Sequence, residues 1–139
     1  MPPIVLASRN KGKIRELAAL FAPFGLTVKG LEDFPEIGEI EETGTSFAEN
    51  ALLKAETVSG LTGLVAVADD SGLIVDALGG EPGIYSARYS AAEGKPATDE
   101  GNIRKVLEKM RDIPEERRAC RFVSAMAAAG PGIPQELQE

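Results

Sequence analysis

Apolar positions along the chain follow the spacings of an alternating α/β protein. Helical spacing predicts three helices, which run from Lys11 to Phe21, from about Phe47 to Ser59, and from Thr98 to about Met110. Short apolar runs predict strands at 4–7, 26–31, 64–68, 73–78 and 121–127. This order predicts an α/β fold, with a mixed sheet that is flanked by helices.

Local signals refine the ends of these elements. Ser46 precedes Glu49 by three positions, which is a capping box, and Gly60 is expected to end the helix that follows. The run Asp69-Asp70-Ser71-Gly72 predicts a tight turn between two strands. Thr98 is expected to cap the third helix, which has one apolar face made of Ile103, Val106, Leu107 and Met110. The last ten residues are mostly polar, and no strand is predicted there.

Composition excludes several classes of protein. At 139 residues, 43% hydrophobic and 27% charged, the chain can form a globular core. No apolar run approaches the roughly 20 residues of a membrane span, and no secretory signal is evident. The one cysteine, Cys120, cannot form an internal disulfide and is expected in the core; we expect a cytoplasmic protein without membrane contact.

The absence of histidine excludes histidine-based catalysis, histidine metal sites and Ser-His or Cys-His triads. The net charge of −7 argues against general nucleic-acid binding, because that affinity comes largely from neutralising phosphates. Binding of a polyanion would need a local basic site or a divalent metal.

The first candidate for chemistry is the segment Ser8 to Lys13, where a strand ends and a helix begins. Amide groups at a helix start favour an anion, and Lys13 can reach a phosphate. It is not a Walker loop, because only Gly12 is present. The alternative is a plain helix cap with solvated lysines.

Carboxylates supply the second candidate. The acidic loop from Glu32 to Glu42 is mostly a solvated surface, but Mg²⁺ needs only one or two carboxylates beside phosphate oxygens and water. Asp69 and Asp70 are adjacent, so we expect one to be structural and the other to face a site, unless both belong to a plain turn. Lys54, on an apolar helical stripe, needs a partner or a route to water.

These segments, in this order, closely resemble the inosine triphosphate pyrophosphatases. That family hydrolyses non-standard purine nucleoside triphosphates. The matching runs are Leu6–Lys13 with Glu16-Leu17, Glu41–Gly44, Phe47, Glu49–Ala51, Lys54-Ala55, Ala68–Leu73, Leu78–Gly80 and Pro82–Tyr89. The resemblance covers residues 3 to about 127, and it implies Mg²⁺-dependent hydrolysis of dITP, ITP and XTP to the monophosphate and pyrophosphate.

The resemblance also implies roles for matched positions. Asp70 would activate the attacking water, and Glu42 and Asp70 would hold Mg²⁺, with Glu36 and Glu41 as alternatives to Glu42. Contacts to the nucleoside triphosphate would come from Ser8, Arg9, Asn10, Lys11, Gly12, Lys13, Lys54 and Ser71. The implied fold has two lobes, and the implied assembly is a homodimer.

Members of that family are longer than this chain, and continue with Gly-Phe-Gly-Tyr-Asp-Pro and Ser-His-Arg segments that help to hold the base. Neither segment occurs here. We therefore expect residues 1–129 to form the pyrophosphatase domain without its C-terminal third, so that the second lobe is incomplete, and residues 130–139 to be a polar tail. The alternatives are an inactive phosphate-binding fragment, a self-assembling structural form, and a phosphohydrolase with Asp70 as its nucleophile.

Overall fold

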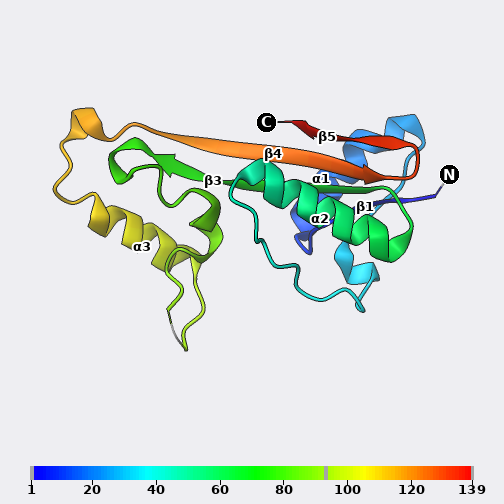
Figure 1. Ribbon diagram of the computed structural model, residues 1–139, viewed down its shortest axis with the longest axis horizontal. Helices are drawn as coiled ribbons and strands as arrows, with labels where there is room; N and C mark the ends of the chain where they lie inside the picture. Colours follow the sequence, from blue (N-terminus) through cyan, green and yellow to red (C-terminus); the bar gives the residue numbers. More distant parts are fainter. Residues whose placement is uncertain (1, 93, 139) are drawn as a thin grey trace. The chain divides into compact units, whose positions relative to one another are not determined.

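The computed structural model describes residues 2–92 and 94–138, and it contains one mixed sheet with helices against it (Figure 1). The sheet has five strands in the order β2-β1-β3-β4-β5, with β1 parallel to β2 and β3, and β4 antiparallel to β5. The strands are β1 (Ile4–Leu6), β2 (Val28–Lys29), β3 (Ala66–Val75), β4 (Cys120–Gly130) and β5 (Ile133–Gln138). This confirms the expected fold class.

Three α-helices and five short 3₁₀ segments complete the fold. The α-helices are α1 (Lys11–Phe21), α2 (Phe47–Thr62) and α3 (Asp99–Lys109). The 3₁₀ segments are η1 (Ala22–Phe24), η2 (Leu31–Asp33), η3 (Asp76–Leu78), η4 (Gly83–Arg88) and η5 (Glu115–Arg117). Among the described residues, no helix has the length and apolar character needed to cross a membrane.

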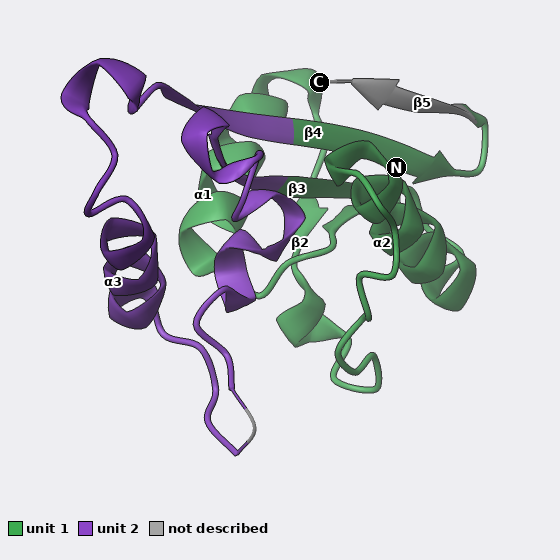
Figure 2. Cartoon of the chain, turned by 60° about the vertical axis from the view of Figure 1, so that its left-hand side comes forward, with its two compact units in different colours: residues 1–70, 125–139 green, residues 71–124 purple. Residues whose placement is uncertain are grey.

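The chain forms two compact units, drawn in different colours in Figure 2. Unit 1 consists of Met1–Asp70 and Ala125–Glu139, and unit 2 consists of Ser71–Ser124. In unit 1, α1 and α2 lie on opposite faces of the parallel strands (Figure 1). Right-handed crossovers require this, because the chain moves from β1 to β2 and then returns past β1 to β3.

The inward stripe of α2 makes much of the core of unit 1. Phe47, Ala51, Ala55 and Val58 are buried there, at the i, i+4, i+8 and i+11 positions of one helix face. The buried residues of β1 and β3, such as Val5 and Ala66, complete this core. Small alanine side chains let the helix pack closely on the strands.

Helix caps confirm the predicted starts of α2 and α3. Ser46 Oγ accepts from the Glu49 amide, and Thr98 Oγ1 accepts from the Gly101 amide. The predicted end of α2 at Gly60 is wrong. The helix continues to Thr62 and is capped by Gly63, whose φ of 72° is the left-handed conformation that favours glycine.

Asp69-Asp70-Ser71-Gly72 is not a turn. These residues lie inside one continuous ten-residue strand, β3, where two shorter strands were predicted. Asp, Ser and Gly favour turns locally, but pairing with neighbouring strands overrides that preference. Alternating burial along β3 places Asp69 and Asp70 on opposite faces, as adjacent strand residues must lie.

The segment after Gly130 was expected to lack a strand, and this prediction is wrong. β5 pairs with β4 in a hairpin, with Ala127 opposite Leu137. The hairpin turn uses Gly132 at a φ of 77°. A polar strand is hard to recognise from sequence, because its pairing with the long strand β4 comes from backbone hydrogen bonds.

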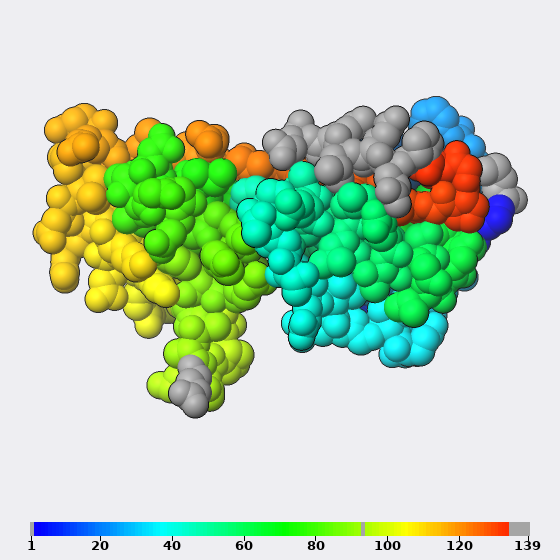
Figure 3. Space-filling model, viewed as in Figure 1, coloured from blue at the N-terminus to red at the C-terminus, as the bar shows by residue number. Residues whose placement is uncertain are grey.

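One burial prediction is also wrong. Cys120 is exposed at the start of β4 rather than in the core. On α3, which lies at the surface of unit 2 (Figure 3), Met110 is buried, but Ile103 is 61% exposed and Leu107 is 59% exposed. The apolar face of α3 is therefore only partly covered.

Substitutions at two glycines of α2 should have opposite effects. Gly60→Ala should raise the free energy of unfolding by about 0.5–1 kcal/mol, because Gly60 is in the helix and has open space around its Cα. Gly63→Ala should lower it by about 1 kcal/mol, because alanine is strained at that φ. Urea unfolding of both variants measures this; equal effects would contradict the assigned helix end.

Candidate active site

The early end of β1 creates the candidate site in unit 1. β1 ends at Leu6, which is in register with Val67, and the Ala7 amide makes a last hydrogen bond of 2.8 Å to the Val67 carbonyl oxygen. The chain then turns at Ser8 towards α1, whereas β3 continues through Asp69 and Asp70. Ligands of open α/β sheets collect at such carboxyl ends of parallel strands.

Two lysines from opposite faces of the sheet converge at this point. Lys13 Nζ, from α1, donates to Asp69 Oδ2 at 3.0 Å. Lys54 Nζ, from α2, donates to the main-chain oxygen of Asp69 at 2.6 Å and lies 3.9 Å from Asp70 Oδ1. The predicted need of Lys54 for a partner on its apolar stripe is thus confirmed.

Asp70 is the buried carboxylate of the site, with 8% of its surface exposed. Burial and the neighbouring Glu42 side chain raise the pKa of Asp70 from its ordinary value of 3.8 to about 6. Lys54 and Asn50 oppose this rise in the pKa, but do not cancel it. The site therefore carries more negative charge than its own lysines balance.

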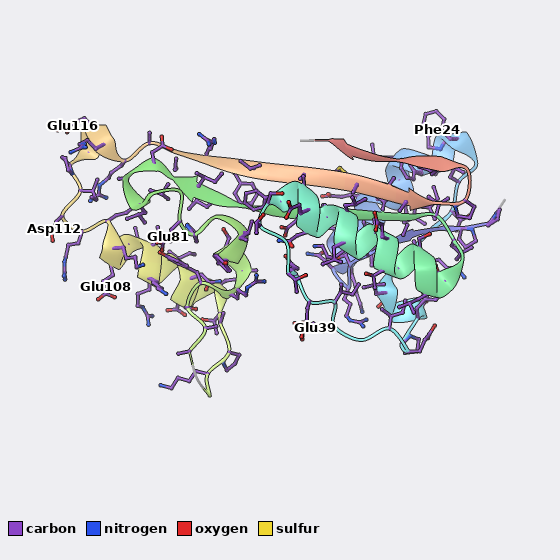
Figure 4. The ribbon with its side chains drawn as sticks, in the orientation of Figure 1. Phe24, Glu39, Glu81, Glu108, Asp112 and Glu116 are labelled. Carbon is purple, nitrogen blue, oxygen red and sulfur yellow. The ribbon has the colours of Figure 1, made fainter. Side chains whose placement is uncertain are left out.

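The loop that precedes α2 brings Glu42 to this position. The Gly44 amide donates to Asn50 Oδ1 at 2.7 Å, and a Cβ on Gly44 would lie 2.7 Å from that same oxygen. Glycine is required here because the loop approaches α2 this closely. Glu36 and Glu41 are exposed, and Glu39 extends from the loop into solvent (Figure 4).

The start of α1 forms the second wall of the site. Asn10 Oδ1 accepts from the amides of Gly12 at 2.9 Å and Lys13 at 3.1 Å, and Ser8 Oγ accepts from the Asn10 amide at 3.0 Å. The cap thus engages two amides that were expected to face an anion. The Lys13 ammonium group adds a charged donor to this turn.

Arg9, a predicted ligand contact, makes a contact within the protein. Its guanidinium donates to the Ile37 carbonyl oxygen at 2.6 Å, which ties the loop before α2 to the end of β1. Lys11 and Gly12 are exposed on the first turn of α1.

The structure brings together four predicted residues, which are Lys13, Glu42, Lys54 and Asp70. Ser71 belongs to unit 2, where it lines a groove with Leu73, Pro82 and Ser86. Sequence reasoning missed Asn50 as part of the cluster. Its signal was a polar residue four positions before Lys54, on the helix face that is otherwise apolar.

The carboxylates of Asp70 and the neighbouring Glu42 fit a divalent cation. Asp70 Oδ2 and Asn50 Nδ2 are buried without a hydrogen-bond partner among the described residues. No group of three or more acidic, histidine or cysteine side chains in that part of the chain forms a full metal cage. Mg²⁺ needs none, because it binds through one or two carboxylates together with phosphate oxygens and water.

Comparisons with known proteins agree with this geometry. A family model described as the Ham1 family matches residues 4–139. The dITP/XTP pyrophosphatase of Bacillus cereus is 52% identical over 131 residues, which are 94% of this chain and 62% of that protein. The dITP/XTP pyrophosphatase of Geobacillus kaustophilus is 50% identical over all 139 residues, or 67% of that protein.

Solved structures give the same result. The Staphylococcus aureus Ham1 protein superposes with a TM-score of 0.86 at 39% identity, over 98% of this chain and 67% of that one. A nucleoside-triphosphatase / dITP/XTP pyrophosphatase from Mycobacterium abscessus has a TM-score of 0.84 at 44% identity, over 99% and 70%. The chain spans less than two thirds of the Bacillus cereus relative.

Asp70→Asn should stabilise the metal-free protein at neutral pH. The raised pKa of Asp70 means that its contribution to stability is fully present below pH 3.8, and is lost as the pH rises through about 6. Asparagine at position 70 does not titrate. The free energy of unfolding of the variant should therefore exceed that of the parent by about 1–3 kcal/mol at pH 7.5, and by much less at pH 4.5. Urea unfolding without divalent cations at both pH values measures this.

Added Mg²⁺ provides the matched test of the same carboxylate. It should stabilise the parent more than Asp70→Asn, because the variant loses a charged ligand. Two results would contradict the unbalanced charge assigned to this site. One is a difference in free energy of unfolding between variant and parent that does not change with pH, and the other is a variant that is less stable than the parent at pH 7.5.

Proposed function

Because the chain belongs to the Ham1 family, we propose that it hydrolyses non-standard purine nucleoside triphosphates, namely dITP, ITP and XTP, to the monophosphate and pyrophosphate. The observation that carries this proposal is the pairing of Lys13 and Lys54 with Asp69 and Asp70 at the end of β1. Ammonium groups suit a triphosphate, and a buried carboxylate beside them suits the activation of water.

In the proposed reaction, the first turn of α1 and the two lysines hold the triphosphate and neutralise its charge. A water molecule attacks the α-phosphorus, the bond from that phosphorus to the bridging oxygen breaks, and pyrophosphate leaves. The proton of the attacking water passes to Asp70. With a pKa of about 6, Asp70 is mostly ionised at pH 7.5 and is still basic enough to accept that proton.

Glu42 and Asp70 would hold the metal, for which we propose Mg²⁺. When bound, a divalent cation would supply charge neutralisation on the phosphate oxygens. Asn50 holds the Glu42 loop close to α2 through the Gly44 amide, and so keeps Glu42 beside Asp70. The other residues implied by the resemblance stay proposed substrate contacts, namely Ser8, Arg9, Asn10 and Ser71. A homodimer stays the proposed assembly.

Pyrophosphate release from XTP, ITP, dITP and ATP, with and without Mg²⁺, tests the proposed activity. We expect Mg²⁺-dependent release that favours XTP and the inosine nucleotides. Asp70→Asn should reduce it at least 100-fold, because the amide cannot accept the proton. Mg²⁺-dependent nucleotide binding without release would instead identify a phosphate-binding piece of the family's domain, and unchanged release by Asp70→Asn would reject the assignment of Asp70.

Lys13→Ala separates phosphate binding from helix capping. It should weaken the binding of inorganic tripolyphosphate about tenfold, because a charge-assisted contact is lost. It should change the free energy of unfolding without ligand by less than about 1 kcal/mol, because the ion pair is partly exposed. Calorimetric titration and urea unfolding measure the two effects, with Lys29→Ala as the control for loss of one exposed charge. A larger loss of stability than of binding would favour a capping role.

A further inference from the structure

We propose that Asp69 is a positioning residue that anchors both Lys13 and Lys54 for phosphate binding, an inference that rests on the proposed function of this site. Neither the predicted site nor the resemblance assigned a role to Asp69. The structure gives it two different contacts, one through its carboxylate and one through its main-chain oxygen.

The anchor for Lys54 exists because β1 ends early. The Val67 carbonyl oxygen accepts the last hydrogen bond from β1. Carbonyl groups two residues apart along a strand point to the same edge, so the Asp69 carbonyl also faces the edge that β1 occupied. Lys54 Nζ takes this place at 2.6 Å, and the Lys54 side chain is only 16% exposed.

The anchor for Lys13 is an ion pair of 3.0 Å with Asp69 Oδ2. Lys13 keeps 46% of its side-chain surface exposed, whereas Asp69 keeps 19%. An exposed lysine without a partner samples many rotamers, and binding a phosphate would cost that freedom. The ion pair restricts the rotamers of the Lys13 side chain before the ligand binds. It leaves two of the three ammonium N–H groups of Lys13 for phosphate oxygens.

The two anchors respond differently to substitution. Asp69→Asn removes the charge that holds Lys13, but leaves the main-chain oxygen that holds Lys54. The effect of Asp69→Asn should therefore depend on the presence of Lys13. Asp69→Glu keeps the charge and should retain most of the anchoring.

A double-mutant cycle with Asp69→Asn and Lys13→Ala tests the proposal, with inorganic tripolyphosphate as the ligand in calorimetry. Asp69→Asn alone should weaken binding about fivefold, which corresponds to part of the rotamer entropy of a lysine. In the Lys13→Ala background, it should change binding less than about twofold. Asp69→Glu should stay within about twofold of the parent, as should the matched control Asp112→Asn, which removes one exposed carboxylate after α3.

Two results would overturn the proposal. Tighter binding by Asp69→Asn would mean that Asp69 only competes with phosphate for Lys13. Equal weakening in both backgrounds would mean that Asp69 acts without Lys13. Urea unfolding of each variant shows whether the fold is intact, which we expect because the ion pair is partly exposed.

The calorimetric cycle does not depend on turnover, so the two proposals fail separately. If the effects of Asp69→Asn and Lys13→Ala on binding are coupled as predicted, but the parent releases no pyrophosphate, the anchoring role of Asp69 is retained and the proposed hydrolysis is rejected. Hydrolysis by the parent without the coupling would reject the anchor and retain the function. A parent chain that binds no tripolyphosphate would reject the anchor, whatever the turnover.

Discussion

The early end of β1 beside the longer strand β3 is the constraint on which the candidate site depends. Past Val67, β3 has no β1 partner, so the Asp69 carbonyl is open to a side chain. The same chain reversal starts α1 at Lys11, because Ser8 and Asn10 cap that helix. One topological feature thus places the lysines, the carboxylates and a helix start at a single point in unit 1.

Negative charge exceeds positive charge around Asp70 in the candidate site. Asp70 is buried beside Glu42, and the positive charge nearest to it is Lys54 at 3.9 Å, which is beyond hydrogen-bond distance. Lys13 and the closest contact of Lys54 are directed to Asp69 instead. In the proposed function, this arrangement would keep the charge of Asp70 available to a cation or to a water proton. It would also separate that charge from Asp69, which we propose orders the lysines.

Much of the fold could be predicted from local sequence, and the site only in part. Ser46 and Thr98 mark helix starts because their caps are local hydrogen bonds. The continuity of β3 through Asp69 and Asp70 was not predictable in this way, since its compensating lysines lie 56 positions away for Lys13 and 15 positions away for Lys54. β5 was missed for a related reason: its pairing is supplied by β4, and its own sequence is polar. Asn50 was missed because its partners lie in a loop whose path depends on Gly44.

The unbalanced carboxylate at Asp70 has a consequence for laboratory evolution of this chain. A selection for heat resistance, run without nucleotide or divalent cation, rewards the removal of buried charge. Such a selection would enrich neutral residues at position 70 and basic residues around it. The surviving variants would be more stable, but they would lack the carboxylate that the proposed reaction uses. Supplying the cation during selection would reverse that pressure, since the charged side chain would then have its counterion.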